Sequence, residues 1–227
     1  MAEVAAQQPR LENLTLWQRV YDHLRAEILE GRLEPDTELA EVALSEQLGV
    51  SRGPLREAIG RLAAEGLVTV RPRRGAVVRS LSEEEFLELY QVREALEGMA
   101  VKLAVPRLAP EDFDALASLN QEMDEHGARD EVEEFFHANL EFHARFLDAC
   151  GNTKLQELYR QLLDQLGRYR MRSLTLRGNL RRSVSEHAAI LRAAKRGDAE
   201  RAAQLMADHI RVPQRRLKRG SKGAEAK

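Results

Sequence analysis

The sequence has 227 residues, of which 43% are hydrophobic and 32% are charged, with a formal net charge of −2. This composition is typical of a folded, helix-rich chain and excludes a wholly disordered one, and the length suits two domains. The small net charge gives no global attraction for nucleic acid, so any such binding needs a local basic patch. A single cysteine, Cys150, and the lack of any apolar run of about 20 residues predict a cytoplasmic location without membrane insertion.

The N-terminal third predicts a compact domain over residues 14–79, preceded by a disordered segment over 1–13. A helix is expected over 14–30, where four apolar side chains recur at helical spacing: Leu16, Val20, Leu24 and Ile28. A second helix runs from about residue 39 to a turn at Gly49, and a third begins at Ser51 and ends before Gly66. Two β-rich runs, 67–70 and 76–78, flank a polar turn and predict a β-hairpin. Three helices and a hairpin are typical of a winged helix-turn-helix.

Residues 80–212 predict an all-helical bundle of about six helices, so the fold class is mainly α. Ser82 and Glu85 have the spacing of a capping box and begin a long helix after a short connector near 79–81. Prolines, glycines and asparagines separate the later helices, at 106–110, 127, 151–152, 178–179 and 197–198. The tail over 213–227 is basic and has no apolar periodicity, which predicts disorder.

Arginines are concentrated in the second half of the N-terminal domain. Between Ser51 and Arg79 there are seven of them against two glutamates, which makes this segment a basic patch. Arg52 and Arg56 are four residues apart at the start of the third helix and outside its apolar stripe, so both point outward. Arginines there can pair bidentately with guanine, while those in the hairpin loop suit phosphate or minor-groove contact. The alternative is an ordinary solvated basic surface.

The same region resembles the GntR family of regulators over about residues 15–79. The resemblance rests on Ser51-Arg52-Gly53-Pro54-Leu55-Arg56-Glu57-Ala58, on Glu65-Gly66-Leu67-Val68 and on Arg74-Gly75. It implies a winged helix-turn-helix that binds double-stranded operator DNA, with contacts from Arg52, Arg56 and Gly75. Together with the basic patch, the expected DNA-contacting set is Ser51, Arg52, Arg56, Arg61, Arg73, Arg74 and Gly75.

One arginine interrupts an apolar stripe in the first helix after the connector. The stripe shared with Arg93 contains Phe86, Leu89, Leu96 and Ala100. A guanidinium on an inward face needs an anion. It either forms a structural salt bridge with a glutamate inside the bundle or binds a carboxylate-bearing effector bidentately, and the sequence favours neither.

Three histidines are expected on inward faces of separate helices: His143, His187 and His209. Asn139 precedes His143 by one helical turn, so its amide oxygen shares that face. A single inward histidine is usually a hydrogen-bonded core residue, but three of them with an oxygen donor favour a shared divalent metal ion. Imidazole nitrogens suit Zn²⁺, with Ni²⁺ or Mn²⁺ as alternatives, and leave coordination positions open.

Residues 82–212 resemble the FadR-type (FCD) effector domain of the same family. The resemblance rests on Asn139-Leu140-Glu141-Phe142-His143, Glu186-His187-Ala188-Ala189-Ile190 and Met206-Ala207-Asp208-His209-Ile210. Metal-binding members use an aspartate and three histidines, which implies the same three histidines as ligands and places Asn139 where aspartate is usual. The missing carboxylate would leave the full charge of a divalent ion at the site, which favours an anionic effector.

Together the resemblances imply a transcriptional regulator, more often a repressor than an activator, that binds a palindromic operator as a homodimer. A small carboxylate bound in a metal-containing pocket would adjust its DNA affinity. Two alternatives remain: a regulator in which the metal itself is the signal, and a three-histidine metal hydrolase. A hydrolase would need a general base and would leave the helix-turn-helix without a role, so the chain is not expected to be an enzyme.

Overall fold

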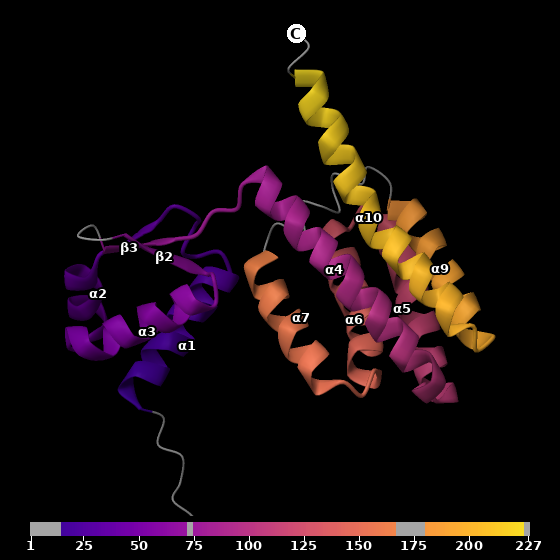
Figure 1. Cartoon of the computed structure of the whole chain (residues 1–227), viewed down its shortest axis with the longest axis horizontal. Coiled ribbons are helices and arrows are strands. Elements are labelled where there is room, and N and C mark those ends of the chain that lie inside the picture. The colour runs from indigo at the N-terminus through magenta and orange to yellow at the C-terminus, as the bar shows by residue number, and fades with distance from the viewer. Residues whose placement is uncertain (1–14, 72–74, 167–179, 225–227) are drawn as a thin grey trace, which may run out of the picture. The chain divides into compact units, whose positions relative to one another are not determined.

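The computed structural model describes residues 15–71, 75–166 and 180–224. The chain divides into two compact units, Met1–Ser80 and Leu81–Lys227, each with its own hydrophobic core (Figure 1). This division lies within two residues of the boundary expected from the sequence. The segment 1–13, predicted to be disordered, lies outside the described residues.

The N-terminal unit consists of three helices and a small antiparallel sheet, as predicted. The helices are α1 (Leu16–Leu29), α2 (Glu41–Leu48) and α3 (Arg52–Ala64), and the hairpin is formed by β2 (Val68–Arg71) and β3 (Gly75–Val78). A further strand, β1 (Glu38–Leu39), pairs with β3 so that the sheet order is β1-β3-β2. The sequence did not predict β1, because a strand of two residues leaves no alternation to detect.

A tight turn sets the angle between α2 and α3. α2 ends at Gly49, whose φ of +64° is in the left-handed region that glycine adopts without strain. Two residues later α3 begins, and its buried side chains pack against α1; they are Leu55, Ala58, Ile59 and Leu62. The remaining faces of α3 are therefore available for other contacts.

The described part of the C-terminal unit contains six α-helices and one 3₁₀ turn, which confirms the predicted bundle. They are α4 (Glu83–Ala104), η1 (Val105–Arg107), α5 (Pro110–Ala128), α6 (Val132–Ala149), α7 (Thr153–Leu166), α9 (Leu180–Lys195) and α10 (Ala199–Ala224). The predicted capping box is present at the start of α4: the Glu85 amide donates to Ser82 Oγ at 3.1 Å, and the Ser82 amide donates to Glu85 Oε2 at 3.0 Å. The break predicted at 178–179 lies outside the described residues.

α4 is the central helix of this unit. It packs against α6, α7 and α10, while α5 packs against α6 and α9, and α9 packs against α10 (Figure 1). The inward faces of α4, α6, α9 and α10 consequently surround one region of the core.

The C-terminal tail differs from the prediction. α10 continues to Ala224, so the segment expected to be disordered from residue 213 is helical as far as that residue. The prediction relied on missing apolar periodicity, which reports on packing against a core rather than on helix formation. Gln, Arg, Leu and Lys, which dominate this segment, are good helix formers, and the single Pro213 does not end the helix.

Candidate nucleic-acid interface and metal centre

The candidate nucleic-acid interface is centred on the start of α3. Ser51 is the N-cap residue with an extended backbone, although its side chain makes no capping hydrogen bond. Arg52 and Arg56 follow on one exposed flank of the helix. Arg61 is also exposed but lies about 140° around the helix axis from Arg56. The structure thus brings Arg52 and Arg56 together and separates Arg61 from them.

Both later arginines of α3 have carboxylate partners. Arg56 Nε donates to Glu41 Oε2 at 2.7 Å, which ties α3 to the first residue of α2. Arg61 Nε lies 3.2 Å from Glu65 Oε1, and the same carboxylate accepts a hydrogen bond from Tyr21 Oη of α1 at 2.8 Å. Arg56 is therefore oriented at the helix-turn-helix, whereas Arg61 belongs to a connection between α1 and α3.

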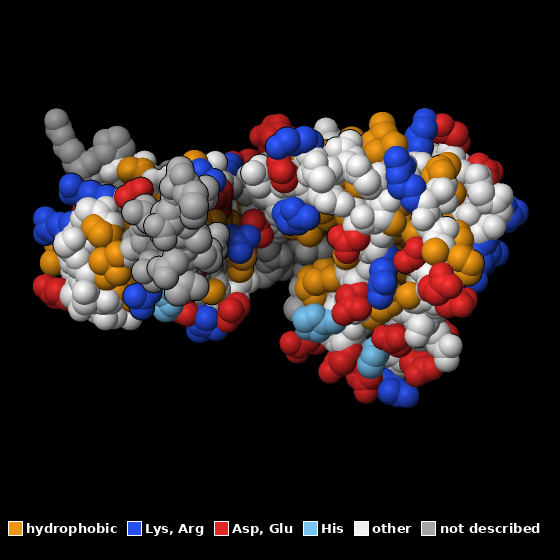
Figure 2. All heavy atoms as spheres, turned by 90° about the horizontal axis from the view of Figure 1, so that it is seen from below, with side chains coloured by type: hydrophobic (Ala, Val, Ile, Leu, Met, Phe, Trp, Pro, Cys, Tyr) orange, Lys and Arg blue, Asp and Glu red, His pale blue; other side chains and the backbone are white. Residues whose placement is uncertain are grey.

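The hairpin contributes one described residue to the predicted set. Gly75 begins β3 with φ +81°, a backbone conformation in which a side chain would be strained. Glycine is thus required at this corner by the backbone alone. Arg73 and Arg74 lie outside the described residues. On the face shown in Figure 2, positive and negative side chains are interspersed over the C-terminal unit, so no region of one sign dominates that face.

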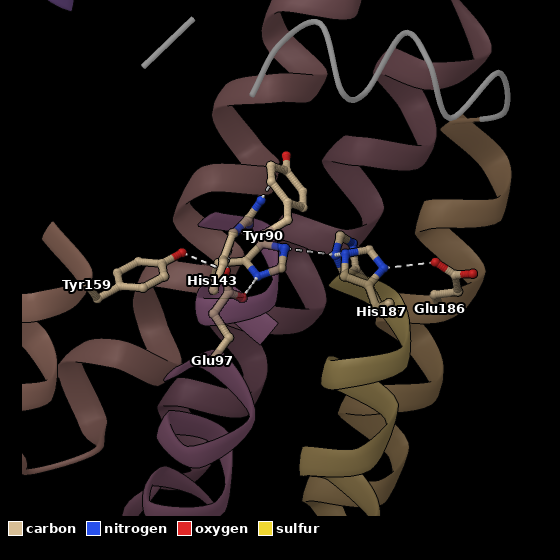
Figure 3. A network of polar contacts seen from close by, with 8 residues as sticks. Tyr90, Glu97, His143, Tyr159, Glu186 and His187 are labelled. Atoms are coloured by element: carbon tan, nitrogen blue, oxygen red, sulfur yellow. Dashed lines mark hydrogen bonds and ion pairs between the residues drawn. The ribbon is translucent and has the colours of Figure 1, made fainter. Parts of the chain in front are cut away.

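The second candidate site lies inside the C-terminal unit, where three histidines converge (Figure 3). His143 of α6, His187 of α9 and His209 of α10 are each at most 1% exposed. His187 Nε2 lies 3.3 Å from His143 Nε2 and 3.0 Å from His209 Nε2. The structure therefore brings together the three histidines that the sequence singled out.

Carboxylates bind the outer nitrogens of two of these rings. His143 Nδ1 contacts Glu97 Oε2, and His209 Nδ1 lies 2.8 Å from Glu186 Oε2. Because a carboxylate accepts, the proton of each neutral ring is on Nδ1 and the Nε2 lone pair faces His187. A single proton on His187 Nε2 satisfies only one of those lone pairs. A cation where the three nitrogens converge satisfies all of them.

Asn139 supplies an oxygen donor on the same helix face as His143. It is 5% exposed, and its Oδ1 has no hydrogen-bond partner among the described residues. Leaving a buried acceptor unsatisfied costs about 1–3 kcal/mol. An amide oxygen in this position fits the coordination of a metal ion.

Arg93 occupies the structural salt bridge that the sequence left as an alternative to effector binding. It is 4% exposed, and its Nε donates to Glu97 Oε1 at 2.6 Å. Tyr159 Oη donates to the same oxygen at 2.7 Å. Burial by itself raises the pKa of Glu97, but the Arg93 guanidinium and His143 outweigh it and hold that pKa well below its usual range. Burial lowers the pKa of Arg93, and the Glu97 charge more than offsets this.

Sequence reasoning missed the two carboxylates that orient the histidines. Glu97 follows Arg93 by four residues, so the helical spacing of the pair was the available signal. Glu186 directly precedes His187, yet it contacts His209 of the neighbouring helix. Spacing along one helix does not reveal a contact with another.

A pocket of about 400 Å³ between α9 and α10 reaches the outer side of this centre. Its lining includes Glu186 and His209, and Arg182 at its wall donates from Nε to Glu186 Oε1 at 2.7 Å. The volume is within the usual range of small-molecule sites. Solvent species therefore have access to a residue that orients one of the histidines.

A winged helix-turn-helix followed by a separate helical domain with a buried histidine cluster defines a two-domain DNA-binding regulator. Residues 16–78 match the model of the "Bacterial regulatory proteins, gntR family", and residues 88–212 match the "FCD domain". The chain belongs to the GntR family and carries an FCD domain. This family consists of DNA-binding transcriptional regulators, so the chain is not an enzyme and the hydrolase alternative is excluded.

Relatives agree with this assignment along most of the chain. The HTH-type transcriptional repressor GlaR of Escherichia coli (strain K12) is 31% identical over 201 residues, covering 85% of this chain and 91% of the relative. The HTH-type transcriptional regulator McbR of the same organism is 27% identical over 202 residues, covering 88% and 91%. The solved structure "E. coli McbR/YncC" superposes with a TM-score of 0.70 at 26% identity, covering 92% of this chain and 99% of that one. Among the described residues, no helix is long and apolar enough to cross a membrane.

Proposed function

We propose that this regulator is a repressor whose affinity for operator DNA is adjusted by a small carboxylate bound at a metal-containing site in the C-terminal domain. It acts on DNA in the cytoplasm as a homodimer. The observation that carries the proposal is the convergence of three histidine Nε2 atoms beside the unpartnered oxygen of Asn139.

The residues present fit a divalent metal ion. Two nitrogens bound at about 2.0–2.1 Å to one ion are about 2.8–3.4 Å apart, depending on the coordination angle. The two measured separations, 3.3 and 3.0 Å, are within this range. His143, His187, His209 and Asn139 would hold the ion, with Zn²⁺ favoured and Ni²⁺ or Mn²⁺ possible. Such an ion acts as a Lewis acid that offers its open positions to an anionic oxygen.

The charge balance supports an anionic effector. All four donors are neutral, so they do not reduce the charge of a divalent ion. The nearest buried carboxylate, Glu97, is balanced by Arg93, and Glu186 is shared with Arg182. A buried charge without compensation is costly. A carboxylate that enters from the pocket between α9 and α10 would offset it and would meet Arg182 at the pocket wall.

The N-terminal unit supports the DNA-binding half of the proposal. Arg52 and Arg56 would contact base edges in the major groove, and the hairpin that contains Gly75 would contact the backbone. A two-fold homodimer matches two half-sites of a palindromic operator. Repression is favoured because a relative with 31% identity, GlaR, is named a repressor. The effector must bind the DNA-competent and DNA-incompetent states unequally.

The DNA-binding half is tested by fluorescence anisotropy with an operator fragment at fixed salt. Arg52→Ala and Arg56→Ala should each weaken operator binding by about tenfold or more, since a good base contact contributes about 1–3 kcal/mol. Arg145→Ala is the matched control, because Arg145 is exposed on α6 in the other unit. Equal losses in all three variants would contradict a specific role for α3.

The effector half uses the same assay at saturating metal. A panel of small mono- and dicarboxylates is added to the wild type and to His187→Ala. A carboxylate-dependent change in operator affinity that the variant loses supports the proposal. If metal alone changes the affinity and no carboxylate adds to it, the metal is the signal. An unchanged carboxylate response in His187→Ala would place the effector elsewhere.

A further inference from the structure

The outer face of α4 carries an apolar stripe that no other described helix covers. Val92 and Met99 are 50% and 47% exposed, and Ala95 between them is exposed as well. The opposite face of α4 contains the buried Arg93 and Glu97. The stripe therefore lies on the side of α4 that points away from the histidine cluster.

The neighbouring helices pack on other faces of α4. Gly98 faces α10, where an added Cβ would be 3.6 Å from the Ala203 carbonyl oxygen, and Glu94 pairs with Arg211 of α10. On the side of α7, Tyr159 reaches Glu97. Of the large hydrophobic side chains described in this unit, the one further exposed example is Leu158, at 56%. It lies on α7, which packs against α4, so exposed apolar surface is confined to two adjacent helices.

The stripe has a self-complementary order. Its exposed residues are Glu88, Val92, Ala95, Met99 and Lys102, which read in either direction as a charge, a large apolar residue, a small one, a large apolar residue and the opposite charge. An antiparallel second copy of α4, related by a two-fold axis near Ala95, would place Val92 on Met99 and Glu88 on Lys102. Ala95 at the axis would allow the two backbones to approach closely.

We propose that this face of α4 is the two-fold interface between two copies of the chain. The same patch serves both partners, as a two-fold dimer requires, and its two oppositely charged ends pair only with an antiparallel copy. Lys102 also pairs with Glu200 of its own chain, but its side chain stays 46% exposed and accessible to a second carboxylate. The inference rests on the homodimer in the proposed function and identifies the surface that forms it.

Cysteine cross-linking of the full chain tests the position of the axis. Ala95→Cys should form a disulfide-linked dimer under mild oxidation, because residue 95 would meet its own copy. Glu88→Cys is the matched control on the same stripe: its two copies would be about 21 Å apart, from 14 residues at 1.5 Å each. The native Cys150 is 1% exposed and does not interfere. Equal cross-linking of both variants would contradict the proposed axis.

Charge reversal measured by sedimentation velocity provides a second test. Glu88→Lys and Lys102→Glu should each raise the dimer dissociation constant by about tenfold, because each creates two like-charge contacts. The double variant should return it to within about threefold of the wild type. Val70→Asp, at a 55% exposed position in the N-terminal unit, should leave it unchanged.

The outcomes separate this inference from the proposed function. A dimeric wild type that neither cross-links at residue 95 nor responds to charge reversal would overturn the α4 interface and leave the homodimer intact. A monomeric wild type at all concentrations would overturn both.

Discussion

Asn139 determines how much charge remains at the metal centre. Its amide oxygen is neutral, whereas a carboxylate in the same place would attract a divalent ion directly. We expect Asn139→Asp to tighten metal binding by about tenfold or more and to weaken the effect of a carboxylate effector, measured by competition with a chromophoric chelator and by operator titration. Asn120→Asp is the control, because Asn120 also has a buried, unpartnered Oδ1 but lies on α5 outside the cluster. Equal gains in both variants would contradict a ligand role for Asn139.

Glu97 and Glu186 hold two histidine rings in place but differ in their surroundings. Glu97→Gln and Glu186→Gln should each weaken metal binding by about 10–100-fold, the usual cost of losing a partner of a ligating histidine. Only Glu97→Gln leaves the buried Arg93 without its counter-charge, so it alone should lower the free energy of unfolding by about 3–5 kcal/mol. Metal competition and urea unfolding measure the two effects, and equal destabilisation by both variants would count against this distinction.

Glu41 positions an arginine that the sequence assigned to DNA. We expect Glu41→Gln to lower the ratio of operator affinity to random-DNA affinity, because Arg56 loses the contact that orients it. Removing a negative charge also raises affinity for any DNA. Glu38→Gln controls for that effect, since Glu38 is an exposed carboxylate of the same unit. Anisotropy titrations with both DNAs should show a lower ratio for Glu41→Gln alone.

The residue-scale predictions succeeded where a side chain type was unusual for its place. Three inward histidines are conspicuous on apolar helix faces, and the structure brings their Nε2 atoms together. Glu97 and Glu186 were not recognised because glutamate is common in helices and its partner depends on packing between helices. The choice between two roles for Arg93 likewise needed the position of Glu97 in space.

Among the elements, the turn between α2 and α3 depends on the backbone of one glycine. Gly49→Ala should destabilise the N-terminal unit by about 1–2 kcal/mol, because φ at this residue is +64°. Gly60→Ala should instead stabilise it by about 0.5–1 kcal/mol, since Gly60 is within α3 and nothing lies within 4 Å of an added Cβ. Thermal unfolding of the two variants measures these opposite changes, and shifts of the same sign would contradict the backbone argument.

Periodicity predicted the long helices and the hairpin because their apolar faces are buried. The limits of that signal are visible at β1 and in α10. β1 has only two residues, Glu38 and Leu39, and gains its identity from pairing with β3. The end of α10 has no apolar periodicity, so the sequence pattern could not distinguish a polar helix from a disordered tail.

At the scale of the whole molecule, the two separate cores predict that metal removal acts on one unit only. The three histidines join α6, α9 and α10, so a chelator should lower the melting temperature of the C-terminal unit; at 100 times Kd, a bound ion contributes about 2.7 kcal/mol. Trp17, the single tryptophan, lies on α1 and reports on the N-terminal unit. Tryptophan fluorescence should melt unchanged with chelator while far-ultraviolet circular dichroism melts earlier. A parallel shift of both signals would show that the units unfold together.

The capping box at Ser82 begins α4 only two residues after the N-terminal unit ends at Ser80. Glu97, which contacts His143, lies 14 residues into the same rigid helix, about 21 Å from its first turn. α4 can therefore act as a lever with its fulcrum beside the histidines. A tilt of about 3° at Glu97 displaces the first turn by about 1 Å, enough to alter the spacing of two DNA-reading helices without any unfolding.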